Sequence, residues 1–220
     1  MRWELAASKK RGIPPRKNPA AAGRGRNGMK KTIGIVGGMG PLATADLLEK
    51  MIRSADAATD QQHAHIIADC NTAHYFYDRL QPFINVPMLH MPRETAQRAH
   101  ELGDTRCALL ATDGTVHAGI YDEAFAAEGI ELLKPDAEGQ RAVMDMIYSG
   151  VKAGRHDYDT AAVHRALDAL KAQGAQAFIL GCTELPIAFV DYGFDEVTID
   201  PTQILAEAAL RAVGMKVKER

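Results

Sequence analysis

Two cysteines occupy similar positions in the chain, each at the end of an apolar run and each followed by a polar turn that contains threonine. Cys70 follows Ile66–Asp69 and opens Cys-Asn-Thr-Ala-His, and Cys182 follows Ala177–Gly181 and opens Cys-Thr-Glu-Leu-Pro. A positioned thiol or thiolate can give or take a proton in a reaction. Two facing thiols suit removal of a proton from one side of a carbon and its return on the other. The pattern therefore predicts that Cys70 and Cys182 form a catalytic pair.

Short apolar runs alternate with segments of helical periodicity, which predicts an α/β protein with mainly parallel sheets flanked by helices. Strands are predicted at Thr32–Val36, Ile66–Asp69, Val86–His90, Cys107–Ala111, Ile130–Leu133, Ala177–Leu180 and Val197–Ile199. Helices are predicted at Thr44–Ala55, Ala73–Leu80, Glu94–Leu102, Gly119–Glu128, Gln140–Ala153, Thr160–Gln173 and Thr202–Val213.

The position of each cysteine along its strand distinguishes the predicted catalytic cysteines from the predicted structural one. Ligand sites of parallel sheets lie at the carboxyl ends of strands, where Cys70 and Cys182 fall. A helix that followed either turn would lower the thiol pKa through its N-terminus. Cys107 begins a strand, at the wrong end for such a site, so we expect it to be structural.

The chain reads as two cycles of strands and helices, each opening with a strand and a glycine-containing turn and ending at a cysteine turn. This indicates an internal duplication with two pseudo-symmetric lobes and the active site in the cleft between them. The predicted lobes are residues 29–104, joined by the returning segment 200–220, and residues 105–199. The first lobe is shorter, because the interval from Gly37 to Cys70 is less than half that from Thr112 to Cys182.

Composition indicates an ordinary globular protein: 46% of the 220 residues are hydrophobic and 25% are charged. No run approaches the about 18 consecutive apolar residues of a membrane helix. Three scattered cysteines form neither a disulfide framework nor a zinc motif, which favours a reducing, cytoplasmic compartment. The net charge is −2, and the acidic remainder after residue 28 argues against nucleic acid as the main partner.

Residues 1–28 differ from the rest, with eight Lys or Arg, one acidic residue and no apolar periodicity. We predict that this basic extension is disordered. A nucleic-acid arm, a transit peptide, and an upstream extension ahead of a start at Met29 are all compatible with it.

Short polar side chains follow the strand ends and have two possible roles. They can complete turns and helix caps, or they can hydrogen bond a carboxylate or ammonium group. The residues concerned are Asn71, Thr72, Thr112, Thr115 and Thr183. His74 and His117 follow these turns and are candidates for a supporting role. His63 and His65 have no third ligand nearby, so no metal site is predicted.

The segment Gly38–Ala43 has the spacing of a dinucleotide fingerprint, G-x-G-x-x-A, between a strand and a helix. Such a site also needs an acid at a strand end about 20 residues later. Asp56 and Asp60 are near that distance but lie in a polar loop. The alternative is that the glycine turn and helix N-terminus bind a smaller anion such as a carboxylate.

Several motifs together resemble the aspartate/glutamate racemase family. The segment Thr32–Thr44 resembles its N-terminal motif, and Cys70–His74 and Gly181–Glu184 are similar to its two cysteine motifs. Ala111–Thr115 and Gly150–Gly154 also match the family pattern. The resemblance runs from about Lys30 to the C-terminus.

The resemblance implies a cofactor-independent racemase of an acidic amino acid, most like aspartate racemase, that works as a homodimer. Cys70 and Cys182 would then be the acid/base pair, and their roles would swap with the handedness of the substrate. Lys152 matches a lysine that binds the side-chain carboxylate. The implied substrate-binding residues are Met39, Asn71, Thr72, Thr112, Thr115, Lys152, Thr183 and Glu184.

One stretch departs from the family pattern. His63–Ile67 resembles the second strand of the family, yet it joins Ala68–Cys70, which resembles the end of the third, almost directly. The intervening loop, helix and strand start are missing, and Thr59 stands where the family has a basic residue. Two alternatives therefore stand beside the racemase: an amino-acid-binding paralogue with impaired catalysis, and a related lyase or isomerase acting on a dicarboxylate or hydantoin.

Overall fold

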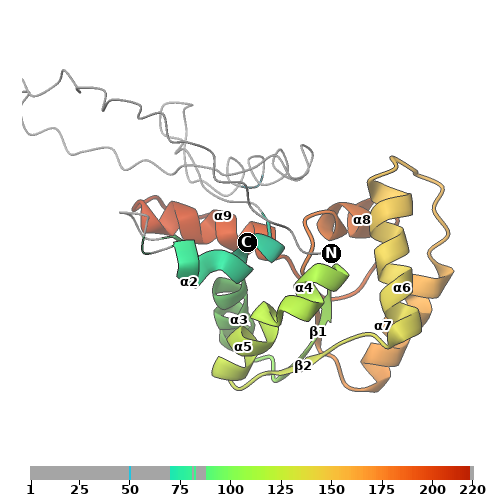
Figure 1. Ribbon diagram of the computed structural model, residues 1–220, viewed down its shortest axis with the longest axis horizontal. Coiled ribbons are helices and arrows are strands. Elements are labelled where there is room, and N and C mark those ends of the chain that lie inside the picture. The colour runs from blue at the N-terminus through green and yellow to red at the C-terminus, as the bar shows by residue number, and fades with distance from the viewer. Residues whose placement is uncertain (1–49, 51–69, 81, 83–87, 219–220) are drawn as a thin grey trace, which may run out of the picture. The chain divides into compact units, whose positions relative to one another are not determined.

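The computed structural model describes residue 50, residues 70–80, residue 82 and residues 88–218 (Figure 1). All of them fall within one unit, Lys31–Arg220. The predicted glycine turn with Met39, and the strands Thr32–Val36 and Ile66–Asp69, lie outside the described residues. So does the predicted helix Thr44–Ala55, apart from Lys50, which is helical. The stretch in which the first lobe is predicted to be shortened also lies outside them.

A parallel four-stranded sheet forms the centre of the described structure, with the strand order β2-β1-β3-β4. The strands are β1 (Arg106–Leu110), β2 (Glu131–Leu133), β3 (Ala177–Leu180) and β4 (Thr198–Ile199). Cys107 pairs with Ala177 and Leu110 with Leu180, so β1 and β3 end at the same edge. Apart from Arg106 at the start of β1, both strands are apolar and buried, because helices cover both faces of the sheet.

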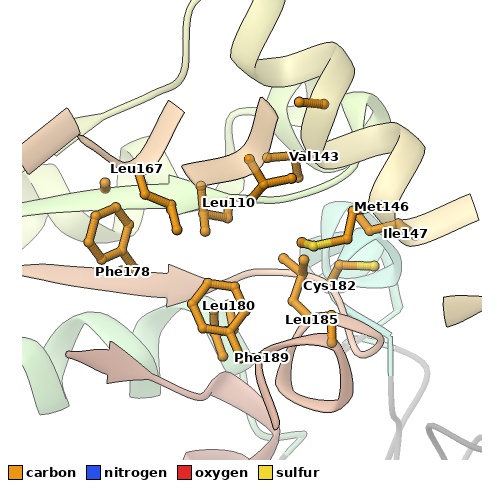
Figure 2. Packing of buried hydrophobic residues seen from close by; sticks show 14 of the residues in the cluster. Leu110, Val143, Met146, Ile147, Leu167, Phe178, Leu180, Cys182, Leu185 and Phe189 are labelled. Carbon is orange, nitrogen blue, oxygen red and sulfur yellow. The ribbon is translucent and has the colours of Figure 1, made fainter. Parts of the chain in front are cut away.

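Two groups of helices cover the two faces of this sheet (Figure 1). On one face, side chains of α3 (Met91–Leu102), α5 (Ile120–Ala127) and α9 (Pro201–Ala212) pack on Leu109 and Ile179. On the other, Leu110, Phe178 and Leu180 pack against Val143 and Leu167, as Figure 2 shows. The elements on that second face are α6 (Ala137–Asp145), the π-helix η4 (Met146–Val151), α7 (Ala161–Ala172) and α8 (Leu185–Asp191).

Local sequence signals set several helix ends. Asp136 caps α6 by accepting a hydrogen bond from the Gly139 N–H, and Asp200 caps α9 by accepting from the Thr202 N–H. Gly103, at φ 83°, ends α3, because a residue with a Cβ is strained in that conformation. The predicted stop of α7 at Gly174 is confirmed, with a φ of 93°.

Four predicted segments differ from the structure. Thr112–Thr115, predicted as a turn, begins the short helix α4 (Asp113–Ala118), and Gly119 at φ 67° separates α4 from α5. The predicted helix 73–80 divides into the 3-10 helix η2 (Thr72–Phe76) and α2 (Tyr77–Leu80). The predicted helix 140–153 starts three residues earlier because Asp136 caps it, and it changes to π geometry at Met146. The described end of the predicted strand 86–90, residues 88–90, is not a strand.

Candidate active site

Cys182 lies just beyond the carboxyl end of β3, where the chain passes close to β1. The Gly181 N–H donates to the Leu110 carbonyl at 2.8 Å, and a Cβ on Gly181 would lie 2.7 Å from Leu109 Cδ1. A larger residue at this position would require the buried side chain of Leu109 to move. The next side chain, Cys182, is 8% exposed and packs beside Met146, Ile147 and Leu185 (Figure 2).

A buried carboxylate stands beside this thiol. Glu184 precedes α8, and its Oε2 accepts hydrogen bonds from Cys182 Sγ at 3.0 Å and from Thr183 Oγ1 at 3.1 Å. Its other oxygen, Oε1, lies 3.4 Å from Lys152 Nζ. Lys152 follows η4, and its amine also lies over the ring of Tyr148, 4.8 Å from the ring centre. Both oxygens of the carboxylate are therefore engaged, each by different partners.

The expectation that a following helix lowers the thiol pKa is wrong for Cys182. Burial raises the pKa of the Cys182 thiol, and the charge and hydrogen bond of Glu184 raise it further. A backbone hydrogen bond from Glu184 and the charge of Lys152 lower it, but by less. Cys182 is therefore a thiol at neutral pH. Burial lowers the pKa of Lys152, but the negative groups around it, Glu184 first, outweigh burial and raise it.

Cys70 lies in a less enclosed place than Cys182. It is partly buried, and its carbonyl accepts a hydrogen bond from the Ala73 N–H at 3.2 Å, which starts η2. Nδ1 of His74 is within hydrogen-bond distance of the same carbonyl, at 2.9 Å. Nε2 of His74 lies 3.3 Å from the Leu89 carbonyl. His74 is buried, and burial lowers its pKa. It holds the Cys70 turn to the segment that leads into α3.

Three threonine hydroxyls connect η2 with the end of β1. Thr72 Oγ1 lies 2.8 Å from Thr115 Oγ1, which lies 3.3 Å from Thr112 Oγ1. Thr112 is the N-cap position of α4, yet its side chain makes no capping hydrogen bond. The capping role predicted for Thr112 is therefore not observed, and the three hydroxyls instead join the Cys70 turn to the turn after β1.

A hydrogen bond between Tyr121 and Asn71 connects α5 with the Cys70 turn. The Tyr121 hydroxyl donates to Asn71 Oδ1. Asn71 is only 4% exposed, and within the described chain its Nδ2 has no hydrogen-bond partner. Burial raises the pKa of Tyr121 well above its ordinary value, and a hydrogen bond with the Thr95 side chain lowers it by less. The Tyr121 hydroxyl is therefore protonated and donates to the residue beside Cys70.

The structure gathers the predicted site residues into two clusters and leaves others outside. Asn71, Thr72, Thr112 and Thr115 form one cluster, and Lys152, Cys182, Thr183 and Glu184 form the other. Met39 lies outside the described residues, and His117 is exposed on α4. Cys107 is fully buried in β1, and burial, with the charge of Asp104, raises its pKa to about 12.

Sequence reasoning missed two residues that shape this site. Tyr121 reads as an ordinary core residue of a helix, because Phe125 follows it at helical spacing. Gln140 reads as a surface residue of α6, yet its Nε2 donates to the Ala111 carbonyl at 3.0 Å and to Asp113 Oδ1 at 2.8 Å. It holds the turn between β1 and α4 in place. Neither residue carries a motif signal of its own.

In the described part of the chain, no helix has the length and apolar character needed to cross a bilayer. The same residues contain no group of three His, Cys, Asp or Glu side chains arranged to hold a metal ion.

Comparison with known proteins decides the family. The family model for Asp/Glu/Hydantoin racemase matches residues 64–209. The chain belongs to this family. The broad specificity amino-acid racemase RacX of Bacillus subtilis is 27% identical over 222 positions, covering 81% of this chain and 96% of that protein. The glutamate racemase of Corynebacterium glutamicum is 28% identical, covering 69% of this chain and 55% of that enzyme.

Solved structures agree with the fold predicted from the sequence. Picrophilus torridus aspartate racemase matches with a TM-score of 0.72 and 25% identity, covering 86% of this chain and 96% of that one. The predicted α/β fold of this racemase family member, with a parallel sheet flanked by helices, is confirmed. The alignment with RacX has 222 positions, but only 81% of the 220 residues of this chain take part in it. The other positions are gaps in this chain, so part of RacX has no counterpart here. The missing stretch is not located by that comparison, and the shortened first lobe stays a prediction.

Proposed function

We propose that this protein racemises an acidic amino acid, with Cys70 and Cys182 moving the α-proton on opposite faces of the substrate. The observation that carries the proposal is that both cysteine turns contact the chain at the carboxyl end of β1. Thr72, two residues after Cys70, bonds Thr115 at 2.8 Å, and the N–H of Gly181, the residue before Cys182, donates to the Leu110 carbonyl at 2.8 Å. These contacts support one site for two thiols that are far apart in sequence, in a family of racemases.

The reaction follows from the chemistry of two thiols. One cysteine, as thiolate, removes the α-proton, and the other, as thiol, donates a proton to the opposite face. The roles reverse for the other enantiomer. The carbanion formed between these steps needs an environment that excludes water and stabilises its charge. The apolar packing of Met146, Ile147 and Leu185 around Cys182 supports such an environment.

Carboxylate recognition accounts for the remaining polar groups. The amide Nδ2 of Asn71 is a buried donor without a partner in the described structure, and the hydroxyls of Thr72 and Thr115 lie close by. A buried donor that is left unpaired is costly, so these groups support binding of the α-carboxylate. Lys152, the partly exposed cation of the second cluster, supports binding of the side-chain carboxylate.

The range of substrates forms a second candidate function. RacX is named a broad-specificity amino-acid racemase, whereas other relatives are named glutamate or aspartate racemases. A broad-specificity racemase would accept neutral side chains as readily as acidic ones. The charge of Lys152 favours the acidic substrate.

The proposed assembly is a homodimer of two-lobed subunits, which light scattering of the purified protein tests.

Packing of α9 against α3 supports assignment of segment 200–220 to the lobe 29–104.

The deciding experiment follows α-proton exchange in heavy water by NMR, with chiral analysis of the same samples. We expect L- and D-aspartate both to exchange and to interconvert, with glutamate and neutral amino acids as comparison substrates. Exchange of neutral amino acids at equal rates would support the broad-specificity alternative. Thermal stabilisation by aspartate without exchange would indicate a binding protein and overturn the proposal, as would turnover of hydantoins or dicarboxylates alone.

A further inference from the structure

A continuous chain of contacts leads from the protein surface to the buried thiol of Cys182. The side chain of Lys152 is 37% exposed, whereas those of Glu184 and Cys182 are buried. Lys152 contacts Oε1 of Glu184, and Cys182 donates to Oε2. The carboxylate thus lies between a partly exposed cation and a buried thiol.

The Lys152 amine and the Cys182 thiol both interact with the carboxylate of Glu184. With Lys152 in place, Glu184 is an ion-paired carboxylate, and its second oxygen accepts the thiol hydrogen without taking the proton. A carboxylate buried without its cation is unfavourable and becomes more basic. Removal of the Lys152 amine from Oε1 therefore favours transfer of the nearest proton, that of Cys182.

We propose that Lys152 and Glu184 form a relay in which the side-chain carboxylate of the substrate draws Lys152 away and Glu184 then accepts the proton of Cys182. The S–H bond breaks, an O–H bond forms on Glu184, and the thiolate is left facing the substrate. The net charge of the three side chains does not change. When product leaves, the Cys182 sulfur carries the proton taken from the substrate. Lys152 then returns to Glu184, Glu184 releases its proton to water, and the Cys70 thiolate takes a proton from water, which restores the starting state. The relay rests on the proposed function and explains how binding of an acidic substrate activates the site.

The relay makes a specific demand on the substrate. A distal carboxylate would increase the rate of turnover as well as the affinity, because it creates the thiolate that removes the proton. Asparagine has almost the shape of aspartate, but its neutral amide does not attract Lys152. Aspartate and asparagine are therefore a matched pair of probes.

The first test compares kcat and KM for aspartate and asparagine in the unmodified protein, Glu184→Gln and Lys152→Met. We expect a higher kcat for aspartate in the unmodified protein. In Glu184→Gln, kcat for aspartate should fall by about 100-fold, the effect of losing one proton acceptor, and the aspartate-to-asparagine kcat ratio should approach one. Lys152→Met should also bring that ratio towards one, while raising KM for aspartate about tenfold through the lost ion pair.

Two variants control for loss of surface charge. Glu131→Gln removes a carboxylate that pairs with Arg106 at 2.7 Å, at the edge of the sheet opposite Cys182. Lys171→Met removes an amine of α7 that pairs with Asp168 at 2.8 Å and with the largely buried Glu196 at 3.2 Å, so it matches the loss of a lysine beside a buried carboxylate. Both should keep the kcat ratio of the unmodified protein.

A second measurement separates a relay from a purely structural contact. The rate of Cys182 alkylation by iodoacetamide is followed by peptide mass spectrometry between pH 7 and pH 9. The charge of Glu184 disfavours the thiolate, so Glu184→Gln should alkylate faster at Cys182 while turning over aspartate more slowly. Disrupted packing could lower turnover, but it would lower it for aspartate and asparagine alike. It would therefore not bring the aspartate-to-asparagine kcat ratio to one.

The outcomes distinguish the relay from the function on which it rests. An unmodified protein that exchanges no α-proton of any amino acid overturns both. A protein that racemises aspartate, with Glu184→Gln retaining the original kcat and kcat ratio, overturns the relay and leaves the two-thiol racemase standing.

Discussion

The turns that begin at Cys70 and Cys182 have the same predicted chemistry in different surroundings. The Cys182 thiol is buried, and charged groups influence its pKa. It donates to the carboxylate of Glu184, which in turn pairs with the amine of Lys152. The Cys70 turn is more open and is held by uncharged hydrogen bonds, from His74 to its carbonyl and from Tyr121 to Asn71.

The difference teaches that a reaction with mirror-image steps does not need a mirror-image site. In the proposed racemisation each sulfur acts as acid in one direction and as base in the other, but the proton of each can be controlled in its own way. On the Cys182 side, the proposed relay makes the Glu184 carboxylate the acceptor of the proton. On the Cys70 side, the described contacts fix the position of the backbone and of Asn71, a proposed carboxylate-binding residue.

Removal of either thiol tests the comparison most strongly. We expect Cys70→Ala and Cys182→Ala each to reduce racemisation by at least ~1,000-fold, because one of the two proton transfers loses its group. The remaining thiol can still remove and return a proton on its own face. Each variant should therefore exchange the α-proton of one enantiomer only, and the enantiomer should differ between the two variants.

Cys107→Ala is the matched control for both changes. Its sulfur is buried within β1, so the loss should cost about 1 kcal/mol of stability and leave racemisation intact. Chiral chromatography and NMR in heavy water measure both activities. Exchange of the same enantiomer by both active-site variants would show that the thiols do not work on opposite faces.

Much of the described fold was predictable because its signals are local. Apolar runs marked β1 and β3, and Gly174 marked the end of α7, since strand burial and left-handed glycine are set by neighbouring residues. The helix α8 was not predicted, because its start contains Pro186 and its seven residues are too few for a periodic pattern.

The sequence predicted a polar turn after β3 at Gly181–Glu184, but not the electrostatics of that turn. The pKa of Cys182 is raised and not lowered. Burial, the largest cause, depends on Met146 and Ile147, which come from a distant segment. Tyr121 was missed for the same reason, because its partner Asn71 is 50 positions away in the sequence.

Tyr121→Phe tests the uncharged side of the comparison. Loss of the hydroxyl leaves Oδ1 of the buried Asn71 without its donor, so the amide is no longer held in one orientation. We expect KM for aspartate to rise roughly tenfold with a smaller change in kcat, the result of one lost hydrogen bond to a group that binds substrate. Steady-state kinetics of the folded variant measure both constants.

Tyr158→Phe provides the control for loss of a phenol. Its hydroxyl donates to Asp145 at 2.9 Å and contacts neither cysteine turn. KM in this variant should equal that of the unmodified protein. An equal rise of KM in both variants would mean that Tyr121 does not act through Asn71.

The smallest expected effect concerns the two histidines around the Cys70 turn. Burial lowers the pKa of His74, and it lowers that of His90 from 6.5 to about 4, helped by the charges of His74 and Arg93. In the folded protein the pKa of each histidine lies below its pKa in the unfolded chain. As the pH falls below 6.5, the unfolded chain therefore binds more protons than the folded protein. Their contribution to stability is therefore complete above pH 6.5 and is lost towards pH 4.

His90→Asn isolates this contribution. An asparagine can still accept the capping hydrogen bond from the Arg93 N–H but does not titrate in this range. His90 is partly exposed, which reduces the effect. We therefore expect the variant to lose less stability than the unmodified protein between pH 6.5 and pH 4, by on the order of 1 kcal/mol or a few degrees in Tm. Thermal unfolding at each pH measures it, with His117→Asn on the exposed face of α4 as the control. Identical slopes of Tm against pH in all three proteins would show that the packing of His90 does not depend on its neutral form.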